Sequence, residues 1–254
     1  MGSAEQLDGW RRDEAAGFEG WDFSHIAGRS SQQEPPWSYR ERAGELVQGA
    51  ARLLDIDTGG GEFLVSLAPL PRGSVALESY PPNVAVARER LEPLGVDVQG
   101  VELGAAWALD AASFDLILNR QGHINAPAID RCLKAGGRFL TQQVGDGNLA
   151  DLAALFGQPT IGLENSFASA SAELTGCGLS IVRGEAWTGL QTFADVGALV
   201  YFLKAIPWVV PGFSVDSHRA GLDALQHRAD AGAPLSFTIE RFLIEAQKPL
   251  ERAA

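Results

Sequence analysis

Cysteine and lysine are scarce in this chain of 254 residues. The two cysteines, Cys132 and Cys177, are far apart and form no C-x-x-C pair, which argues against a disulfide framework and against a thiolate metal site. The sequence also has no H-E-x-x-H motif and no cluster of acids with histidine, so we expect no metal ion. This cysteine usage fits a reducing compartment, and we expect a cytoplasmic protein.

Long hydrophobic runs are absent as well. No apolar stretch approaches the length that spans a bilayer, and the acidic, polar N-terminus lacks the apolar region of a secretory signal. We therefore expect no membrane partner. Hydrophobic residues still make up 46% of the chain, which suffices for the core of one large α/β domain or of two small ones.

Basic clusters are the third absence. The chain has 32 acidic residues against 20 lysines and arginines, a net charge of −12, and its bases never gather beyond pairs such as Arg11–Arg12. A protein that follows a phosphate backbone usually carries a basic patch, because the release of counterions supplies much of its affinity. Nucleic acid is therefore an unfavoured partner, and the oligomeric state is left open.

What the sequence does contain is an alternation of strand and helix patterns. Helices are expected between the strands, at residues 41–51, 62–68, 83–95, 126–137 and 165–178, with late ones at 195–206 and 214–232, the last capped by Ser214 or Asp216. Single helices between strands favour parallel pairing. We predict an α/β, Rossmann-like, doubly wound and mostly parallel seven-stranded sheet with helices on both faces and one antiparallel late strand. The expected strands are 51–56, 74–79, 96–101, 113–119, 138–144, 179–193 and 235–248.

The remaining N-terminal segment, residues 1–40, is expected to be irregular and is rich in aromatic side chains. We interpret it as a lid on a domain that spans residues 41–254. Within that domain, the pattern divides into a cofactor half, about residues 45–145, and an acceptor-side half, about residues 146–254.

The stretch LLDIDTGGGEFL, residues 53–64, joins a strand to a helix through three glycines. This arrangement places bare backbone and a helix N-terminus at a ligand. A P-loop is excluded because no lysine follows the glycines. The dinucleotide pattern G-x-G-x-x-G, begun at Gly59, fails because its last position falls on Leu64.

Four motifs follow one another in a fixed order. The first is an acid followed by a glycine set, at Asp55, Thr58, Gly59, Gly60 and Gly61. The second is Glu78, an acid at the end of a strand, where a carboxylate suits ribose hydroxyls. The third is the strand SFDLILN (113–119), and the fourth is LKAGGRF (133–139). Together they resemble the class I S-adenosylmethionine-dependent methyltransferases, closely over residues 45–145.

The resemblance implies S-adenosylmethionine as cofactor and S-adenosylhomocysteine as product. By it, the glycines pass beneath the methionine and ribose, and Glu78 holds the ribose with Ser79 beside it. Glu102 and Leu103 then lie near the adenine, with Trp107 or Leu109 against its face, and Asn119 approaches the methionine end.

Asp57 departs from the family pattern, because it stands where the first glycine of the set belongs. In one interpretation its carboxylate pairs with the ammonium or the sulfonium of the cofactor. In the other it crowds the methionine carboxylate and weakens or abolishes binding.

Methyl transfer is an in-line displacement that depends on orienting the acceptor. In the stretch after residue 119, His123 is a candidate base for an acceptor that must lose a proton, and Arg120 a candidate to orient an acidic group. The alternatives are a solvated loop histidine and an arginine that pins the loop to the sheet.

Aromatic residues outside these motifs have two interpretations, a pocket for the acceptor or a lid packed on core helices. The candidates for the acceptor pocket are Trp21, Phe23, Trp37, Tyr39, Tyr201 and Trp208. We expect a methyltransferase that acts on an O or N atom of a small, partly apolar acceptor. The alternatives are a methyltransferase fold that has turned to other chemistry or binding, and an RNA base methyltransferase.

Overall fold

The computed structural model describes residues 3–18, 22–102, 104–158 and 165–250. The chain divides into two compact units, each assembled from three segments. The boundary between the units falls within two long strands, β7 and β8. We call one the sheet unit (residues 36–145, 164–187 and 241–254) and the other the N-terminal unit (residues 1–35, 146–163 and 188–240).

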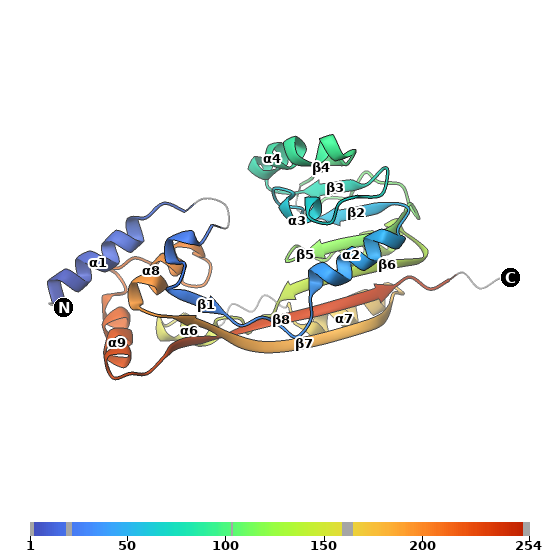
Figure 1. Ribbon diagram of the computed structural model, residues 1–254. Coiled ribbons are helices and arrows are strands. Elements are labelled where there is room, and N and C mark those ends of the chain that lie inside the picture. The colour runs from blue at the N-terminus through green and yellow to red at the C-terminus, as the bar shows by residue number, and fades with distance from the viewer. Residues whose placement is uncertain (1–2, 19–21, 103, 159–164, 251–254) are drawn as a thin grey trace. The chain divides into compact units, whose positions relative to one another are not determined.

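Eight strands in the described part of the chain form a sheet of order β1-β7-β8-β6-β5-β2-β3-β4 (Figure 1). The pairs β3–β4, β2–β3, β2–β5 and β5–β6 are parallel, whereas β8 is antiparallel to β6 and β1 to β7. The doubly wound, mostly parallel α/β sheet is confirmed. The strands are β1 (Ser30–Gln32), β2 (Leu53–Ile56), β3 (Val75–Glu78), β4 (Asp97–Gly100), β5 (Phe114–Arg120), β6 (Leu133–Val144), β7 (Ser180–Phe193) and β8 (Leu235–Gln247).

The strand count differs from the seven predicted, because Ser30–Gln32 pairs with the end of β7 inside a stretch expected to be irregular. The same stretch also contains the helix α1 (Ser3–Ala15). A third difference concerns α5 (Ala126–Cys132), which ends earlier than expected. Residues 133–137 belong instead to β6, whose pairing with β5 shifts register between Phe114 and Leu116.

The helices expected elsewhere are present. The sheet unit has α2 (Tyr39–Gly49), α3 (Glu62–Val65), α4 (Pro81–Leu91) with η2 (Glu92–Leu94), α5 and α7 (Phe167–Gly176). The N-terminal unit has α1, η1 (Ser24–Ile26), α6 (Ala150–Leu155), α8 (Val196–Ala205) and α9 (Arg219–Asp230), which is capped by His218 rather than by Ser214 or Asp216. Among the described residues, no helix is both long and apolar enough to cross a membrane.

Two apolar cores lie on opposite faces of the parallel strands. Leu54 and Ile56 of β2 pack with residues of α5 and α7, whereas Leu53 packs with residues of α2, α3 and α4. All four residues of β2 are buried, as are all four of β3. Burial on both faces explains why these strands appear in the sequence as continuous apolar runs instead of alternating ones.

Glu245 of β8 ties the helix α2 to the sheet. Its two carboxylate oxygens accept from Nε and Nη2 of Arg42, each at 2.8 Å, and Oε1 also accepts from Arg138. Burial raises the pKa of Glu245, but the two guanidinium groups outweigh it and hold that pKa below its ordinary value. This carboxylate is therefore ionised in the folded protein at neutral pH.

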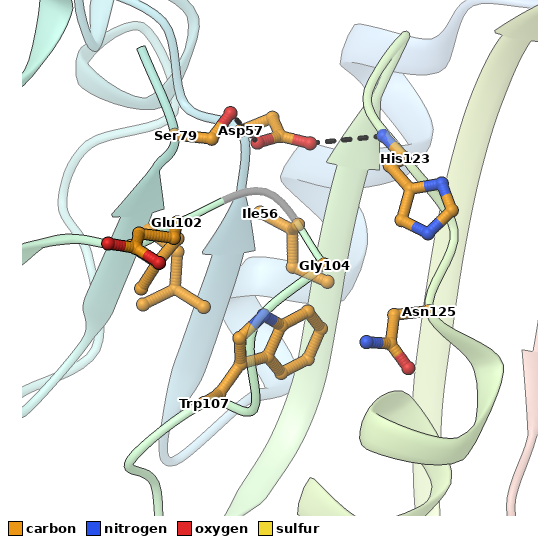
Figure 2. A pocket seen from close by; sticks show the side chains of 10 residues that line it. Ile56, Asp57, Ser79, Glu102, Gly104, Trp107, His123 and Asn125 are labelled. Carbon is orange, nitrogen blue, oxygen red and sulfur yellow. Dashed lines mark hydrogen bonds between the residues drawn. The ribbon is translucent and has the colours of Figure 1, made fainter. Parts of the chain in front are cut away.

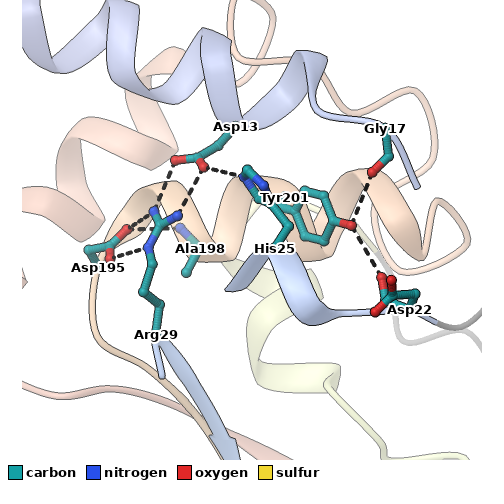
Figure 3. Close-up of polar contacts among 8 residues, drawn as sticks. All are labelled: Asp13, Gly17, Asp22, His25, Arg29, Asp195, Ala198 and Tyr201. Carbon is teal, nitrogen blue, oxygen red and sulfur yellow. Dashed lines mark hydrogen bonds and ion pairs between the residues drawn. The ribbon is translucent and has the colours of Figure 1, made fainter. Parts of the chain in front are cut away.

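A second ionic cluster organises the N-terminal unit (Figure 3). Arg29 donates two hydrogen bonds to Asp13 of α1 and two to Asp195, at 2.7 to 3.0 Å. Asp195 also caps α8 by accepting from the backbone N–H of Ala198, and His25 Nε2 lies 2.9 Å from Asp13 Oδ1. Burial raises the pKa values of both aspartates, but Arg29 outweighs it and lowers them. The cluster thereby joins α1, η1, β1 and α8.

Asp55 is the buried acid of the central strand β2. Burial raises its pKa to about 7, and the neighbouring carboxylates of Asp57 and Glu78 act in the same direction. The folded chain therefore keeps this acid protonated over a pH range in which the unfolded chain ionises it.

We predict that Glu245→Gln lowers the free energy of unfolding by about 2 kcal/mol, because two arginines lose an ionised acceptor. Its matched control is Glu45→Gln, which removes an exposed partner of the same Arg42 and should cost below about 0.5 kcal/mol. Urea unfolding measures both. Since the folded-state pKa of Glu245 is lowered, its stabilisation is lost as the pH falls, and the two variants should converge in acid. Equal costs at neutral pH would contradict the assignment.

A second prediction concerns pH. Because the folded-state pKa of Asp55 is raised from 3.8 to about 7, the stability that it contributes is complete below pH 3.8 and falls as the pH rises to 7. Asp55→Asn should therefore gain a few kcal/mol relative to the wild type across this range, at about 1.4 kcal/mol per pKa unit. Denaturant unfolding of both proteins from acid to neutral pH measures this difference. A constant difference would show that Asp55 has an ordinary pKa.

Candidate cofactor pocket

The glycine loop begins where β2 ends and turns sharply into α3. Its residues Gly59 and Gly61 have φ angles of 63° and 83°, and Asp57 has the unusual φ of 54° for a residue with a side chain. Gly61 is required twice over, since a Cβ there would also lie 2.8 Å from the Leu91 side chain of α4. The loop therefore passes close to α4.

A pocket of about 330 Å³ opens beside this loop, at the carboxyl ends of the parallel strands (Figure 2). Ligands of open α/β sheets bind at this edge, and the order β5-β2-β3 places the pocket at the point where the strand order reverses. All residues that line the pocket belong to the sheet unit. They are Ile56, Asp57, Leu77, Ser79, Val101, Glu102, Gly104, Trp107, His123 and Asn125.

Asp57 bridges three strand ends across the pocket. Its Oδ1 accepts from the Ser79 hydroxyl after β3 at 3.1 Å, and its Oδ2 accepts from the backbone N–H of His123 after β5 at 3.0 Å (Figure 2). The side chain that replaces the family glycine is therefore held by one donor on each oxygen.

Gly122 makes room for this bridge. A Cβ at position 122 would lie 2.7 Å from the Asp57 Cβ and also against its Oδ2. Gly122 and Asp57 are therefore complementary, because the Asp57 side chain occupies the space that a side chain at position 122 would need.

Glu78 lies at the end of β3, as expected from the sequence, but its carboxylate turns to the backbone. Its Oε2 accepts from Gly59 N at 2.6 Å and its Oε1 from Tyr80 N at 2.7 Å. Burial is the main cause that raises its pKa. Glu78 thus fixes the glycine loop to β3, while Ser79 and Glu102 are the neighbouring predicted residues that line the pocket.

Asn119 is fully buried beneath the pocket in a polar network. Its amide donates to Ile56 O at 3.3 Å, and its Oδ1 accepts from Thr141 at 3.0 Å and from Gln143 at 2.6 Å. This network joins β2, β5 and β6. Of the other predicted cofactor residues, Asp55 and Thr58 are buried, Gly60 lies in the loop, and Leu103 lies outside the described residues.

Of the two predicted catalytic residues, His123 lines the pocket and Arg120 does not. The His123 side chain lines the pocket, and Figure 2 shows its ring above Asn125. The guanidinium of Arg120, by contrast, lies over the Phe63 ring, 5.0 Å from the ring centroid, and does not line the pocket.

The predicted aromatic residues are divided between the units. Trp37 is buried in the sheet unit and donates its indole N–H to Gln142 at 2.8 Å, and the Tyr39 hydroxyl donates to Asn119 O at 3.1 Å. In the N-terminal unit, the Tyr201 hydroxyl donates to two backbone carbonyls. There Phe23 packs on Phe202 and Trp208 is 51% exposed, whereas Trp21 lies outside the described residues.

Sequence reasoning missed Asn125. Its Oδ1 accepts from Ala128 N at 3.1 Å and so caps α5, and its side chain also lines the pocket. The signal was present, since an asparagine directly before Ala-Pro at a helix start is a favoured cap. A helix cap at Asn125 marks the turn between β5 and α5, and this turn places the Asn125 side chain at the pocket.

Comparison with known proteins gives partial matches by sequence and broad matches by structure. No family model matches the sequence. A segment of 99 residues is 36% identical to protein-L-isoaspartate O-methyltransferase 2 from Polaromonas sp., covering 37% of this chain and 46% of that protein. The chain therefore matches less than half the length of this curated relative.

Solved structures share the fold at low identity. A proposed methyltransferase from Bacillus halodurans is 17% identical with a TM-score of 0.58, over 82% of this chain and 99% of that one. A 4+2 cyclase is also 17% identical, with a TM-score of 0.52 over 89% and 91% of the two chains. The chain therefore shares the fold of these proteins, and its partial match to an O-methyltransferase agrees with the resemblance to class I S-adenosylmethionine-dependent methyltransferases drawn from its four motifs.

Proposed function

We propose that the protein transfers a methyl group from S-adenosylmethionine to an O or N atom of a small, partly apolar acceptor. The observation that carries this proposal is the pocket at the carboxyl ends of β2, β3 and β4, which is lined by Asp57 at the start of the glycine loop and by Trp107, whereas Gly59, Gly60 and Gly61 do not line it. Its mixed lining suits part of a nucleoside, with an aromatic ring, a carboxylate and a hydroxyl in reach.

The pocket residues divide into groups by the part of the cofactor that they suit. Trp107 offers a flat indole to the adenine, and Glu102 an acceptor for hydroxyl or amino hydrogens. Glu78 is buried and does not line the pocket; each of its oxygens accepts one backbone N–H and keeps a lone pair that would serve a ribose hydroxyl only if the carboxylate became accessible. Asp57 stands toward the β5 side, where the resemblance puts the methionine end.

The chain's own contribution to the reaction is to hold and orient the acceptor. A bound cofactor would supply an electrophilic methyl group on a sulfonium. His123 stands at the pocket and is the candidate base for an acceptor that must lose a proton. Arg120 orients an acidic acceptor only if its guanidinium leaves the Phe63 ring.

The acceptor class follows from charge and from the curated relative. That relative is an O-methyltransferase, which supports an oxygen acceptor. The net charge of −12 disfavours RNA, the second candidate acceptor, because a phosphate backbone would be repelled. The competing candidate is other chemistry on the same fold. It is supported by Asp57 in the glycine set and by the fold's occurrence in a 4+2 cyclase.

We predict that the wild-type protein binds S-adenosylmethionine and S-adenosylhomocysteine with dissociation constants in the micromolar range, measured by isothermal titration calorimetry. Ser79→Phe should weaken both by at least about tenfold, because it places a ring inside the pocket and removes a donor to Asp57. The matched control is Tyr80→Ser, a change at the adjacent, exposed position, which should leave both constants unchanged.

Four outcomes separate the candidates. Binding by the wild type, followed by methyl transfer to a small acceptor from labelled cofactor, supports the proposal. Binding only by Asp57→Gly would favour a fold that has turned to other work. No binding by either protein would remove the cofactor assignment itself, and a salt-sensitive shift of RNA would support the RNA alternative.

A further inference from the structure

The pocket is acidic, with His123 as the titratable side chain beside its two carboxylates among the described residues. Its lining contains the carboxylates of Asp57 and Glu102, and none of the described residues that line it is lysine or arginine. A concave site with low-dielectric walls strengthens the field of the charges at its surface. Such a lining favours a ligand that carries positive charge.

The arginines nearest to these elements are engaged elsewhere. Arg131 donates to the backbone carbonyls of Trp107 and Leu109, and Arg90 donates to Gly60 O and to Glu62. Arg120 lies over the Phe63 ring. None of these three pairs with Asp57, whose hydrogen-bond donors are the uncharged Ser79 hydroxyl and the backbone N–H of His123.

The position of the Asp57 carboxylate is fixed. One oxygen is held by Ser79, the other by the backbone of His123, and Gly122 provides the space between them. Each oxygen still has a lone pair for a further contact. The negative charge therefore stands over the ends of β2 and β5 before any ligand arrives, so its interaction with a cation needs no rearrangement of the side chain.

We propose that Asp57 makes this pocket discriminate by charge between S-adenosylmethionine and S-adenosylhomocysteine. This inference rests on the proposed function. The two molecules differ by one methyl group and by the positive charge of the sulfonium, which becomes a neutral thioether once the methyl group has left. A fixed carboxylate attracts the ammonium group that both molecules share, but the sulfonium charge only of the first, so Asp57 is a specificity-determining residue that favours the substrate form of the cofactor over its product.

The test is the ratio of the dissociation constant of S-adenosylhomocysteine to that of S-adenosylmethionine, measured by calorimetry at low salt. Asp57→Asn keeps both contacts, since an amide oxygen can accept from His123 N and an amide N–H can donate to Ser79, but it removes the charge. We expect the ratio to fall about tenfold, the effect of one partly screened charge pair at contact range. Asp57→Gly, which restores the family glycine, should lower it as well.

The matched control is Glu102→Gln, which removes the same charge from the other carboxylate of the pocket. It should change both dissociation constants together and leave their ratio within about twofold. If both molecules bind and Asp57→Asn leaves the ratio unchanged, or if Glu102→Gln lowers it equally, the inference about Asp57 is wrong while the proposed function stands. If neither molecule binds to the wild type or to the variants, both are wrong.

Discussion

One carboxylate holds the candidate site together. Asp57 joins the ends of β2, β3 and β5 through the Ser79 hydroxyl and the His123 amide, and it does so from a backbone conformation that side chains rarely adopt. At the pocket mouth it links the loop after β5 to Ser79, the residue that follows β3. Asp57 requires a glycine at position 122 in turn, so two residues that lie far apart in the sequence form one structural feature.

Beneath this bridge lies a polar layer that is unusual for a sheet so well buried. Asn119, Thr141 and Gln143 satisfy one another and the carbonyl of Ile56, while Asp55 is buried close to two other acids. Buried polar groups stabilise a fold only when they are paired. The layer therefore links the shape of the pocket floor to the register of β2, β5 and β6.

The sequence predicted β2 and β3 well, because each is a fully buried, largely apolar run that is followed by turn chemistry and a helix. It missed β1, whose three residues are polar and form a strand only through pairing with β7. Local pattern also failed at Leu133, where strand pairing overrides a helix-like glycine stop.

For the candidate site, too, the sequence predicted local features and missed contacts between distant segments. Motif spacing located the glycine loop, Glu78 and His123, but spacing cannot show that Glu78 turns to Gly59 N, or that the carboxylate of Asp57 crosses to β5. Nor can composition separate a pocket aromatic from a core aromatic. The Trp37 indole N–H bonds to Gln142, 105 residues away in sequence, and the Tyr39 hydroxyl bonds to the backbone of Asn119, 80 residues away.

The N-terminal unit consists of three separate segments of the chain, so it cannot be removed by a single truncation. Arg29 and α1 belong to the first segment, whereas Asp195 and α8 belong to the third, and α1 packs on α8. A deletion of the first 35 residues would therefore remove no separable module. It would strip the cover from α8, which is buried along nearly its whole length, and expose an apolar helix to water.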